Sequence, residues 1–467
     1  MKKENKPEKP RSYPQLWRFN LLKVLMPGFF KGQRKNANEK VYYRYLQHVR
    51  FKQIDVAYLL LLVVLSALGL ATMFSASYAS SINITNDNIG YYYAQRQAIF
   101  FLAGFAAIAV LCTDVFDYHM TRSLFANGVI FGLGVLLMVL VLVAGKADPN
   151  EASAIAGDDA GGATRWLSIG GFRFQPSEFM KICLIFALAR ILSVNADKIG
   201  SGASRAEEMI VCIKCFVLIG GTAVLMYKQP HLSGMIIICA IGLSMMFISG
   251  IRFSTLMGFS AVGIVGAAAV VYKKYTENSY VTDRINGWLY TWDEANGDIA
   301  WQTRNSLIAI GSGGWWGLGF RNSRQKFLYL PEPHNDFIFS VICEELGIAG
   351  GLIIITLFLM LTLRGVKVAM NAPDRYGTLL ASGISMHFIL QVLLNVAVVS
   401  NAIPNTGISL PFFSYGGSAV VIQLIEAGLL LNISKQYFEK DSIEKEQKSA
   451  ELIKVDRQAE PAPHSAG

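Results

Sequence analysis

The chain has 467 residues, of which 53% are hydrophobic and 16% charged, and its mean hydropathy is +0.38. This composition is typical of a membrane protein and excludes an ordinary soluble globule. The net charge of +9 comes largely from basic segments beside the apolar runs, which suits contact with membrane lipids and gives no support for nucleic-acid binding.

Apolar runs of about 18–25 residues recur along the chain, the length that a helix needs to cross a bilayer. They predict an all-α polytopic membrane protein with about ten transmembrane helices. No cleavable signal peptide is visible, because the first fifty residues are polar and basic. The predicted spans are 54–76, 95–112, 126–145, 176–193, 209–227, 232–250, 255–272, 336–363, 377–400 and 411–433.

Lys and Arg residues near the spans predict the orientation of the chain. Residues 1–53 carry fourteen of them, whereas the loop 77–94 carries none, so the N-terminus should be cytoplasmic. An even number of spans places the C-terminus on the same side and leaves a large extracytoplasmic loop, 273–335, between spans 7 and 8. We therefore expect a basic cytoplasmic segment, a ten-helix membrane domain over 54–436, and a disordered cytoplasmic tail over 437–467.

Two of the predicted outer loops are long, and loops of such length are uncommon without a function. The first covers 146–175. The second contains the stretch 302–314, which is too short and glycine-rich to span a membrane but too apolar for a solvated loop. A short helix followed by a turn, packed on the outer rim, is predicted there.

A charged cluster marks the start of the span that begins at Pro176. Glu178 and Lys181 are spaced i,i+3, which predicts an ion pair within one helix. Arg165 and Arg173 lie shortly before it, and together these residues form a basic patch suited to phosphate. The alternative is a pair at the membrane surface with no further role.

A second set of polar residues precedes and enters the span that begins near residue 336. Prolines stop the helix from starting earlier, so Asn335 or Asp336 is a natural N-cap. At about 100° per residue, Asp336, Ser340, Cys343 and Gly347 share one narrow stripe, which can line a cavity that opens outward. The alternative is that Asp336 serves only as a cap.

Glu344 and Glu345 lie about two helical turns deeper in the same span. Carboxylates at such a depth are costly unless they are paired. A structural ion pair competes here with a functional role.

The segment 401–418 cannot form a plain helix, because prolines and glycines interrupt it. Irregular backbone at membrane depth persists only where protein or a wet cavity covers it. Gln391 and Asn395 on the preceding span add hydrogen-bonding groups. The six cysteines lie in or beside predicted spans and should pack as small apolar residues without a disulfide. No His/Cys metal-ligand set is present.

Taken in order, these segments resemble the SEDS family (shape, elongation, division and sporulation), whose members include the FtsW, RodA and SpoVE proteins. The resemblance runs from about residue 54 to 436. It rests on Arg165-Trp166, Gln175-Pro-Ser-Glu178 with Lys181, Ser306 to Gly314, Leu330-Pro-Glu332, His334-x-Asp336-Phe-Ile-Phe, Glu344-Glu345, and Pro411 to Ser418.

The resemblance implies an inverting peptidoglycan glycosyltransferase that polymerises lipid II into glycan strands at the outer face of the cytoplasmic membrane. Asp336 matches the family's catalytic aspartate and would be the general base. Glu344, Glu345 and Ser312 would support the site, and a divalent cation between Asp336 and the substrate diphosphate remains compatible with the sequence. Substrate binding is assigned to Arg96, Arg165, Arg173, Gln175, Ser177, Glu178, Lys181, His334, Asn395, Ser414, Tyr415 and Ser418.

Two departures from the family pattern matter. His231 stands where the family usually has an aspartate, so no carboxylate role is carried over to it, and Asn335 replaces the usual threonine before the catalytic aspartate. Glu344 to Gly347 reads more like the division and sporulation members than the elongation ones.

Two other functions compete with polymerisation. The chain could be a lipid II flippase, or a scaffold that activates a class B penicillin-binding protein. The resemblance implies such a transpeptidase as a partner of the enzyme as well. Gly377, Ala381 and Ser385 form a ridge of small residues on which a partner helix could dock, unless that ridge packs inside the bundle.

Overall fold

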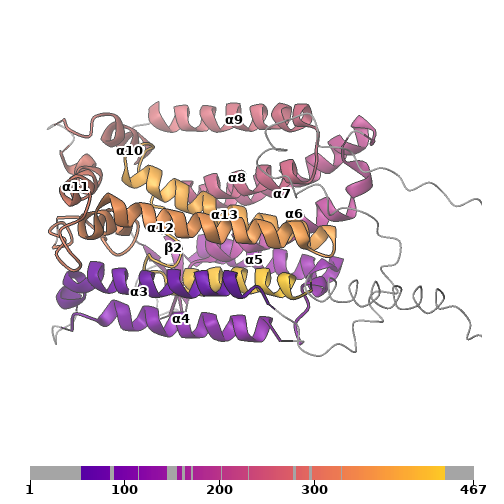
Figure 1. Ribbon diagram of the computed structural model, residues 1–467. Helices are drawn as coiled ribbons and strands as arrows, with labels where there is room; N and C mark the ends of the chain where they lie inside the picture. Colours follow the sequence, from indigo (N-terminus) through magenta and orange to yellow (C-terminus); the bar gives the residue numbers. More distant parts are fainter. Residues whose placement is uncertain are drawn as a thin grey trace, which may run out of the picture.

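The computed structural model is a bundle of helices that run side by side (Figure 1). The predicted segments 1–53 and 437–467 lie outside the described residues. The residues that the structure describes are 54–84, 89–113, 115–144, 155–159, 164–169, 172–200, 202–229, 231–276, 280–293, 297–327 and 329–436.

Every predicted span contains a helix. In a bilayer every backbone N–H and C=O group must find its partner within the protein. A helix satisfies these groups within one segment, so the apolar sequences form helices. These helices are α3 (Val56–Ile84), α4 (Tyr92–Leu111), α5 (Leu124–Ala144), α6 (Pro176–Val194), α7 (Arg205–Lys228), α8 (Leu232–Ile248), α9 (Phe253–Thr276), α12 (Ile338–Asn371), α13 (Arg375–Val399) and a last helix, Gly417–Gln436.

Among the described residues, seven helices are long and apolar enough to cross a membrane. They are α3, α4, α5, α7, α12, α13 and the last helix. The remaining three differ from them in sequence. α6 carries Glu178, Lys181 and Arg190, α8 has only 17 residues, and the apolar part of α9 ends at Gly266. The protein is therefore a multi-pass membrane protein, and the number of ten spans stays a prediction.

α12 and α13 pack against each other along the middle of the bundle (Figure 1). α12 also contacts α3 and α11, while α6 contacts α5, α8 and α13. α13 and the last helix are mostly buried, whereas α4 and α5 expose much apolar surface, as lipid-facing helices do.

The outer loops contain short elements. The loop before α6 forms an antiparallel sheet of β1 (Ile155–Asp159), β2 (Thr164–Ile169) and β3 (Phe172–Phe174), in the order β1-β2-β3 with Leu167 opposite Phe174. This sheet was not predicted from the sequence, although Gly170-Gly171 between two apolar stretches is a hairpin signal. The helix expected over 302–314 is confirmed as α11 (Gly297–Gly313), which follows α10 (Tyr280–Leu289).

α12 is interrupted at Gly347, whose φ is 72° and ψ is −179°. Such a break leaves backbone groups without helical partners. The loop after α11 supplies them: the N–H groups of Leu318 and Gly319 donate to the carbonyls of Glu344 and Glu345 at 2.9 and 3.0 Å. The outer part of α12 is thereby fixed to α11 and its loop.

The small-residue ridge on α13 is internal, so the predicted docking face is wrong. Ala381 and Ser385 are 0% and 1% exposed. A Cβ atom at Gly377 would lie 2.8 Å from the Tyr118 hydroxyl, and one at Gly365 of α12 would lie 2.3 Å from Ser385 Oγ. The small residues let α12 and the loop before α5 approach α13 closely, which is the same property that would have favoured a partner helix.

Candidate active site

A cavity of about 1150 Å³ opens at the end of the bundle where α6 and α12 begin. It is lined by α4, β2, β3, α6, α8, the turn before α12, and the irregular segment between α13 and the last helix. Both polar and apolar side chains face it. The predicted site residues that line it are Arg96, Arg165, Arg173, Gln175, Glu178, Lys181, His334, Asp336, Ser414 and Tyr415.

Asp336 lies at the cavity wall, two residues before α12, and is partly buried. The prediction that Asn335 or Asp336 caps the helix is wrong, because Phe337 is the N-cap and no side chain caps the N-terminus. The chain turns once more before the helix starts, and Asn335 instead donates to Glu332 Oε2 at 2.7 Å. Asp336 is therefore not needed to start the helix.

The carboxylate of Asp336 is unusually basic. Within the described part of the chain, no group donates a hydrogen bond to it. Burial raises the pKa of Asp336 to about 6, although the guanidinium groups of Arg284 and Arg165 act to lower it. The carboxylate is thus ionised at neutral pH and is a stronger base than an exposed aspartate.

Cationic side chains from different elements surround the same cavity. Lys181 is 1% exposed and pairs with Glu178 at 2.8 Å, which confirms the predicted i,i+3 ion pair. Its ammonium also donates to Gln391 Oε1 at 3.3 Å. Arg284 on α10 donates to the carbonyl of Asn405 and reaches the cavity from the outer loop. Such convergent cations suit a diphosphate.

Aromatic rings form another part of the wall. The ring of His334 lies 4.4 Å from that of Tyr93, and Tyr415 meets Tyr93 edge-on at 4.8 Å. Burial lowers the pKa of His334 to about 4, so the imidazole is neutral at neutral pH. Neutral rings of this kind can pack against sugars.

Comparisons with known proteins agree with these features. A family model, FtsW/RodA/SpoVE, described as "Cell cycle protein", matches residues 55–439. The chain belongs to the FtsW/RodA/SpoVE family.

Curated relatives cover most of the chain. The probable peptidoglycan glycosyltransferase FtsW of Trichlorobacter lovleyi is 37% identical over 82% of this chain and 94% of its own length. Stage V sporulation protein E of Bacillus subtilis is 34% identical over 82% of this chain and 97% of its own.

Two solved structures share the fold. A chain of a peptidoglycan synthase complex, studied for the coordination of polymerization and crosslinking, has a TM-score of 0.64 at 24% identity and covers 83% of this chain and 99% of its own. The rod shape determining protein RodA of Thermus thermophilus has a TM-score of 0.55 at 22% identity over 82% of this chain and 96% of its own.

Three residues assigned to substrate binding from the FtsW/RodA/SpoVE pattern do not line the cavity. Ser177 is 1% exposed within the bundle. Asn395 is fully buried and donates to the backbone carbonyls of Asp336 and Ile408. Ser418 Oγ accepts the backbone N–H of Gln175 at 3.1 Å. All three act on the backbone or packing around the cavity.

The two deep glutamates hold the outer loop. Glu345 pairs with Lys326 at 2.8 Å and accepts from Ser75 Oγ at 2.7 Å. Glu344 accepts the backbone N–H of Arg324 at 3.0 Å, and Ser312 Oγ lies 3.4 Å from it. None of these residues lines the cavity, and their contacts tie the loop between α11 and α12 to α12.

The stripe predicted to lie below Asp336 in the cavity wall packs against α11 instead. Ser340 Oγ lies 2.7 Å from Ser306 Oγ, which donates to the carbonyl of Val399 at 2.7 Å. A Cβ atom at Gly313 would lie 2.0 Å from the carbonyl oxygen of Cys343, so α11 sits directly on the stripe. Helical periodicity predicted that the stripe residues share one face, but it could not predict that α11 packs against that face.

Several cavity residues were not predicted from the sequence. Tyr93 and Arg284 belong to none of the predicted motifs, Gln302 opens the stretch 302–314 but was given no role, and His231 was set aside as a departure, yet all four line the cavity. The only available signal for Arg284 was its place in the long outer loop. Among the described residues, no three His, Cys, Asp or Glu side chains converge into a metal site.

Proposed function

We propose that this protein is an inverting peptidoglycan glycosyltransferase that polymerises lipid II, with Asp336 as the general base. The family membership and the relatives named as glycosyltransferases support the reaction class. The observation that carries the assignment is an aspartate of raised pKa, without a hydrogen-bond donor among the described residues, in a cavity lined by cations.

In the proposed reaction, the Asp336 carboxylate removes the proton from the 4-hydroxyl of the acceptor sugar. The resulting oxygen nucleophile attacks the anomeric carbon of the donor glycan from the face opposite the diphosphate, so the configuration is inverted. The anomeric carbon–oxygen bond breaks, and undecaprenyl diphosphate leaves with the bonding electrons. Asp336 then releases its proton to water in the open cavity.

The cations would stabilise the charge that develops on the leaving diphosphate. Arg96, Arg165, Arg173, Lys181 and Arg284 all line the cavity. Fixed charges placed where charge develops are often the largest contribution to catalysis. Apolar residues in the same wall, including Ile99 and Val420, suit the start of a lipid tail.

The deciding experiment measures glycan-chain synthesis from lipid II by the purified protein together with a co-purified class B penicillin-binding protein, the proposed partner. Asp336→Asn should lower the rate by about 10²–10⁴-fold, the usual contribution of a general base, without lowering the melting temperature. Asp283→Asn removes an exposed carboxylate on the same outer face and should keep the wild-type rate.

Near-normal polymerisation by Asp336→Asn would exclude the general-base role. A flippase should instead retain much of its lipid II transport in this variant. A scaffold should stimulate its transpeptidase equally well with either side chain. A septal location follows only if the division role of the FtsW relatives extends to this protein, which fluorescence microscopy of a tagged chain would test.

A further inference from the structure

Three consecutive backbone carbonyls before α12 each accept a hydrogen bond from the region after α13 or from α13 itself. The N–H of Tyr415 donates to His334 at 2.8 Å, and Ser414 Oγ donates to Asn335 at 2.8 Å. Asn395 Nδ2 donates to the carbonyl of Asp336 at 2.9 Å. We call these three donors the carbonyl clamp.

The geometry of the clamp leaves little freedom at its side-chain donors. Ser414 Oγ accepts the N–H of Leu410 at 2.7 Å, so its single proton is directed to Asn335. Asn395 Nδ2 donates also to Ile408, so one buried amide joins the turn before α12 to the irregular segment. Because both acceptors are carbonyls, the amide orientation is set by its partners.

A close backbone approach completes the support of the carboxylate. A Cβ atom at Gly407 would lie 2.9 Å from Asp336 Oδ2, and the φ of Gly407 is +69°. Only glycine combines this conformation with this clearance. The carboxylate is therefore confined by contact on one side without receiving a hydrogen bond there.

We propose that the carbonyl clamp positions the catalytic base, with Asn395 as its principal positioning residue. This inference rests on the proposed function. Hydrogen bonds donated to a carboxylate favour its charged form and lower its basicity. Holding the backbone carbonyls instead places Asp336 accurately and leaves its carboxylate without a hydrogen bond from the described residues, so that it can accept the proton of the acceptor hydroxyl. Asn395 and Ser414 thus act through the backbone of Asn335 and Asp336.

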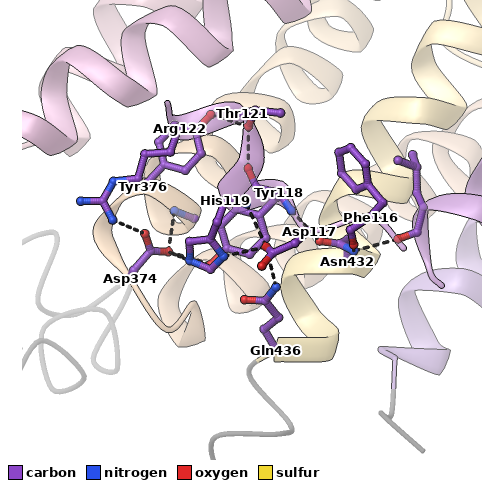
Figure 2. A network of polar contacts seen from close by, with 12 residues as sticks. Phe116, Asp117, Tyr118, His119, Thr121, Arg122, Asp374, Tyr376, Asn432 and Gln436 are labelled. Atoms are coloured by element: carbon purple, nitrogen blue, oxygen red, sulfur yellow. Dashed lines mark hydrogen bonds and ion pairs between the residues drawn. The ribbon is translucent and has the colours of Figure 1, made fainter. Parts of the chain in front are cut away.

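The test uses a matched pair of asparagines. Asn432 on the last helix is also buried, at 1% exposure, and its Nδ2 also donates to two backbone carbonyls, those of Leu111 and Phe116, at 2.7 and 2.9 Å. It lies in the network around Asp117 and Asp374 (Figure 2), and Asp374 follows the end of α12, whereas Asp336 precedes its start. Replacing either asparagine with leucine leaves two backbone carbonyls without this donor, and at Asn432 it also removes the Oδ1 that accepts the N–H of Tyr118 at 3.3 Å.

In the full protein with its transpeptidase partner, Asn395→Leu should lower kcat by about 10- to 100-fold, since misplacement by about 1 Å is worth that much. Its KM for lipid II should change less than threefold, because the residue does not line the cavity. Asn432→Leu should lower the melting temperature by about as much as Asn395→Leu does, but it should keep the wild-type kcat. Ser414→Ala should give a smaller fall in kcat, and Ser414→Thr should restore it by keeping the hydroxyl.

Equal kcat values for Asn395→Leu and Asn432→Leu would overturn the proposal, as would a rise in KM alone. If Asn395→Leu cannot be purified, an unchanged kcat in Ser414→Ala overturns it. A failure of the proposed function has a different signature. In that case Asp336→Asn keeps its activity, whatever the asparagine variants do.

Discussion

Two aspartates at opposite ends of the bundle have opposite environments. Asp336 at the outer cavity receives no hydrogen bond within the described residues, and burial raises its pKa to about 6. Asp117 at the inner end accepts from the N–H and the ring of His119 at 2.9 and 2.7 Å and from Gln436 at 2.9 Å. Burial acts to raise the pKa of Asp117 too, but these donors outweigh it and bring the pKa to about 2.

The surroundings of Asp117 form a network that ties three chain segments together (Figure 2). Asp374 caps α13 by accepting the N–H of Gly377 at 3.0 Å, and it accepts from the hydroxyl of Tyr118 at 2.7 Å. Arg122 lies 3.7 Å from the same carboxylate. The loop before α5, the start of α13 and the end of the last helix are thereby held together.

The difference teaches how one residue type serves two purposes in this fold. Donors around Asp117 stabilise its charge and use its lone pairs, so it contributes to stability and is a poor base. Asp336 has no donor among the described residues, so its lone pairs stay available at some cost in stability. The donors around Asp117 therefore favour a structural role, whereas Asp336, which has no donor among the described residues, is suited to act as a base.

The largest expected effect concerns the ion pair of Glu178 and Lys181, two residues that line the outer cavity. Lys181→Met leaves a buried carboxylate unpaired and should destabilise the protein by about 3–5 kcal/mol. The double variant Glu178→Gln with Lys181→Met should recover most of that stability. If Lys181 also binds the diphosphate, the double variant should still use lipid II poorly.

Thermal unfolding and the KM for lipid II, measured on the single and double variants, separate the two roles. Recovery of both stability and KM in the double variant would make the pair purely structural. The outer cavity would then contain a purely structural ion pair, like the polar network around Asp117. The contrast between the two ends of the bundle would no longer hold.

Gly407→Ala should have a smaller effect. It tests whether catalysis needs the open space beside the carboxylate of Asp336. The added Cβ atom would press on Oδ2, and the positive φ adds strain, so we expect a fall in kcat of about tenfold. Gly314 has φ +55° and open space around its Cβ position. Gly314→Ala therefore controls for strain alone, and an equal loss of kcat in both variants would contradict the steric explanation.

The last prediction concerns the pH dependence, which needs no substitution to be seen. Asp336 must be ionised to act as a base, so initial rates should fall up to tenfold per unit as the pH drops below about 6. An unfolded aspartate has a pKa of about 3.9. Between about pH 4 and 6 folded Asp336 therefore holds a proton that the unfolded chain has released, and its contribution to stability is lost as the pH rises.

Asp117 should show the opposite slope, because its pKa is lowered to about 2. Its contribution to stability is present above about pH 4 and is lost as the pH falls toward 2. Melting temperatures of the wild type, Asp336→Asn and Asp117→Asn across this range give each contribution by difference. Rates that stay constant through pH 6, or slopes of the same sign, would contradict the assignment.

Much of the architecture follows from local sequence. Hydrophobic length predicted where the membrane helices lie, and the i,i+3 spacing predicted the pair of Glu178 and Lys181. Prolines and glycines predicted that 401–418 does not form a plain helix, and the structure confirms irregular backbone up to Gly417, where the last helix begins, with 410–414 buried. These features depend on residues that are close in the sequence, so local backbone geometry is enough to predict them.

Tertiary structure decided which faces meet and therefore what each polar residue does. The small residues Gly377 and Ser385 allow close packing of any helix, and only the fold shows that α12 and the loop before α5 approach them. Asn395 looks like a cavity residue in sequence, but its two carbonyl partners come from segments that the fold brings together. Likewise the basicity of Asp336 depends on burial, which is a property of the assembled bundle rather than of the residues beside it in the chain.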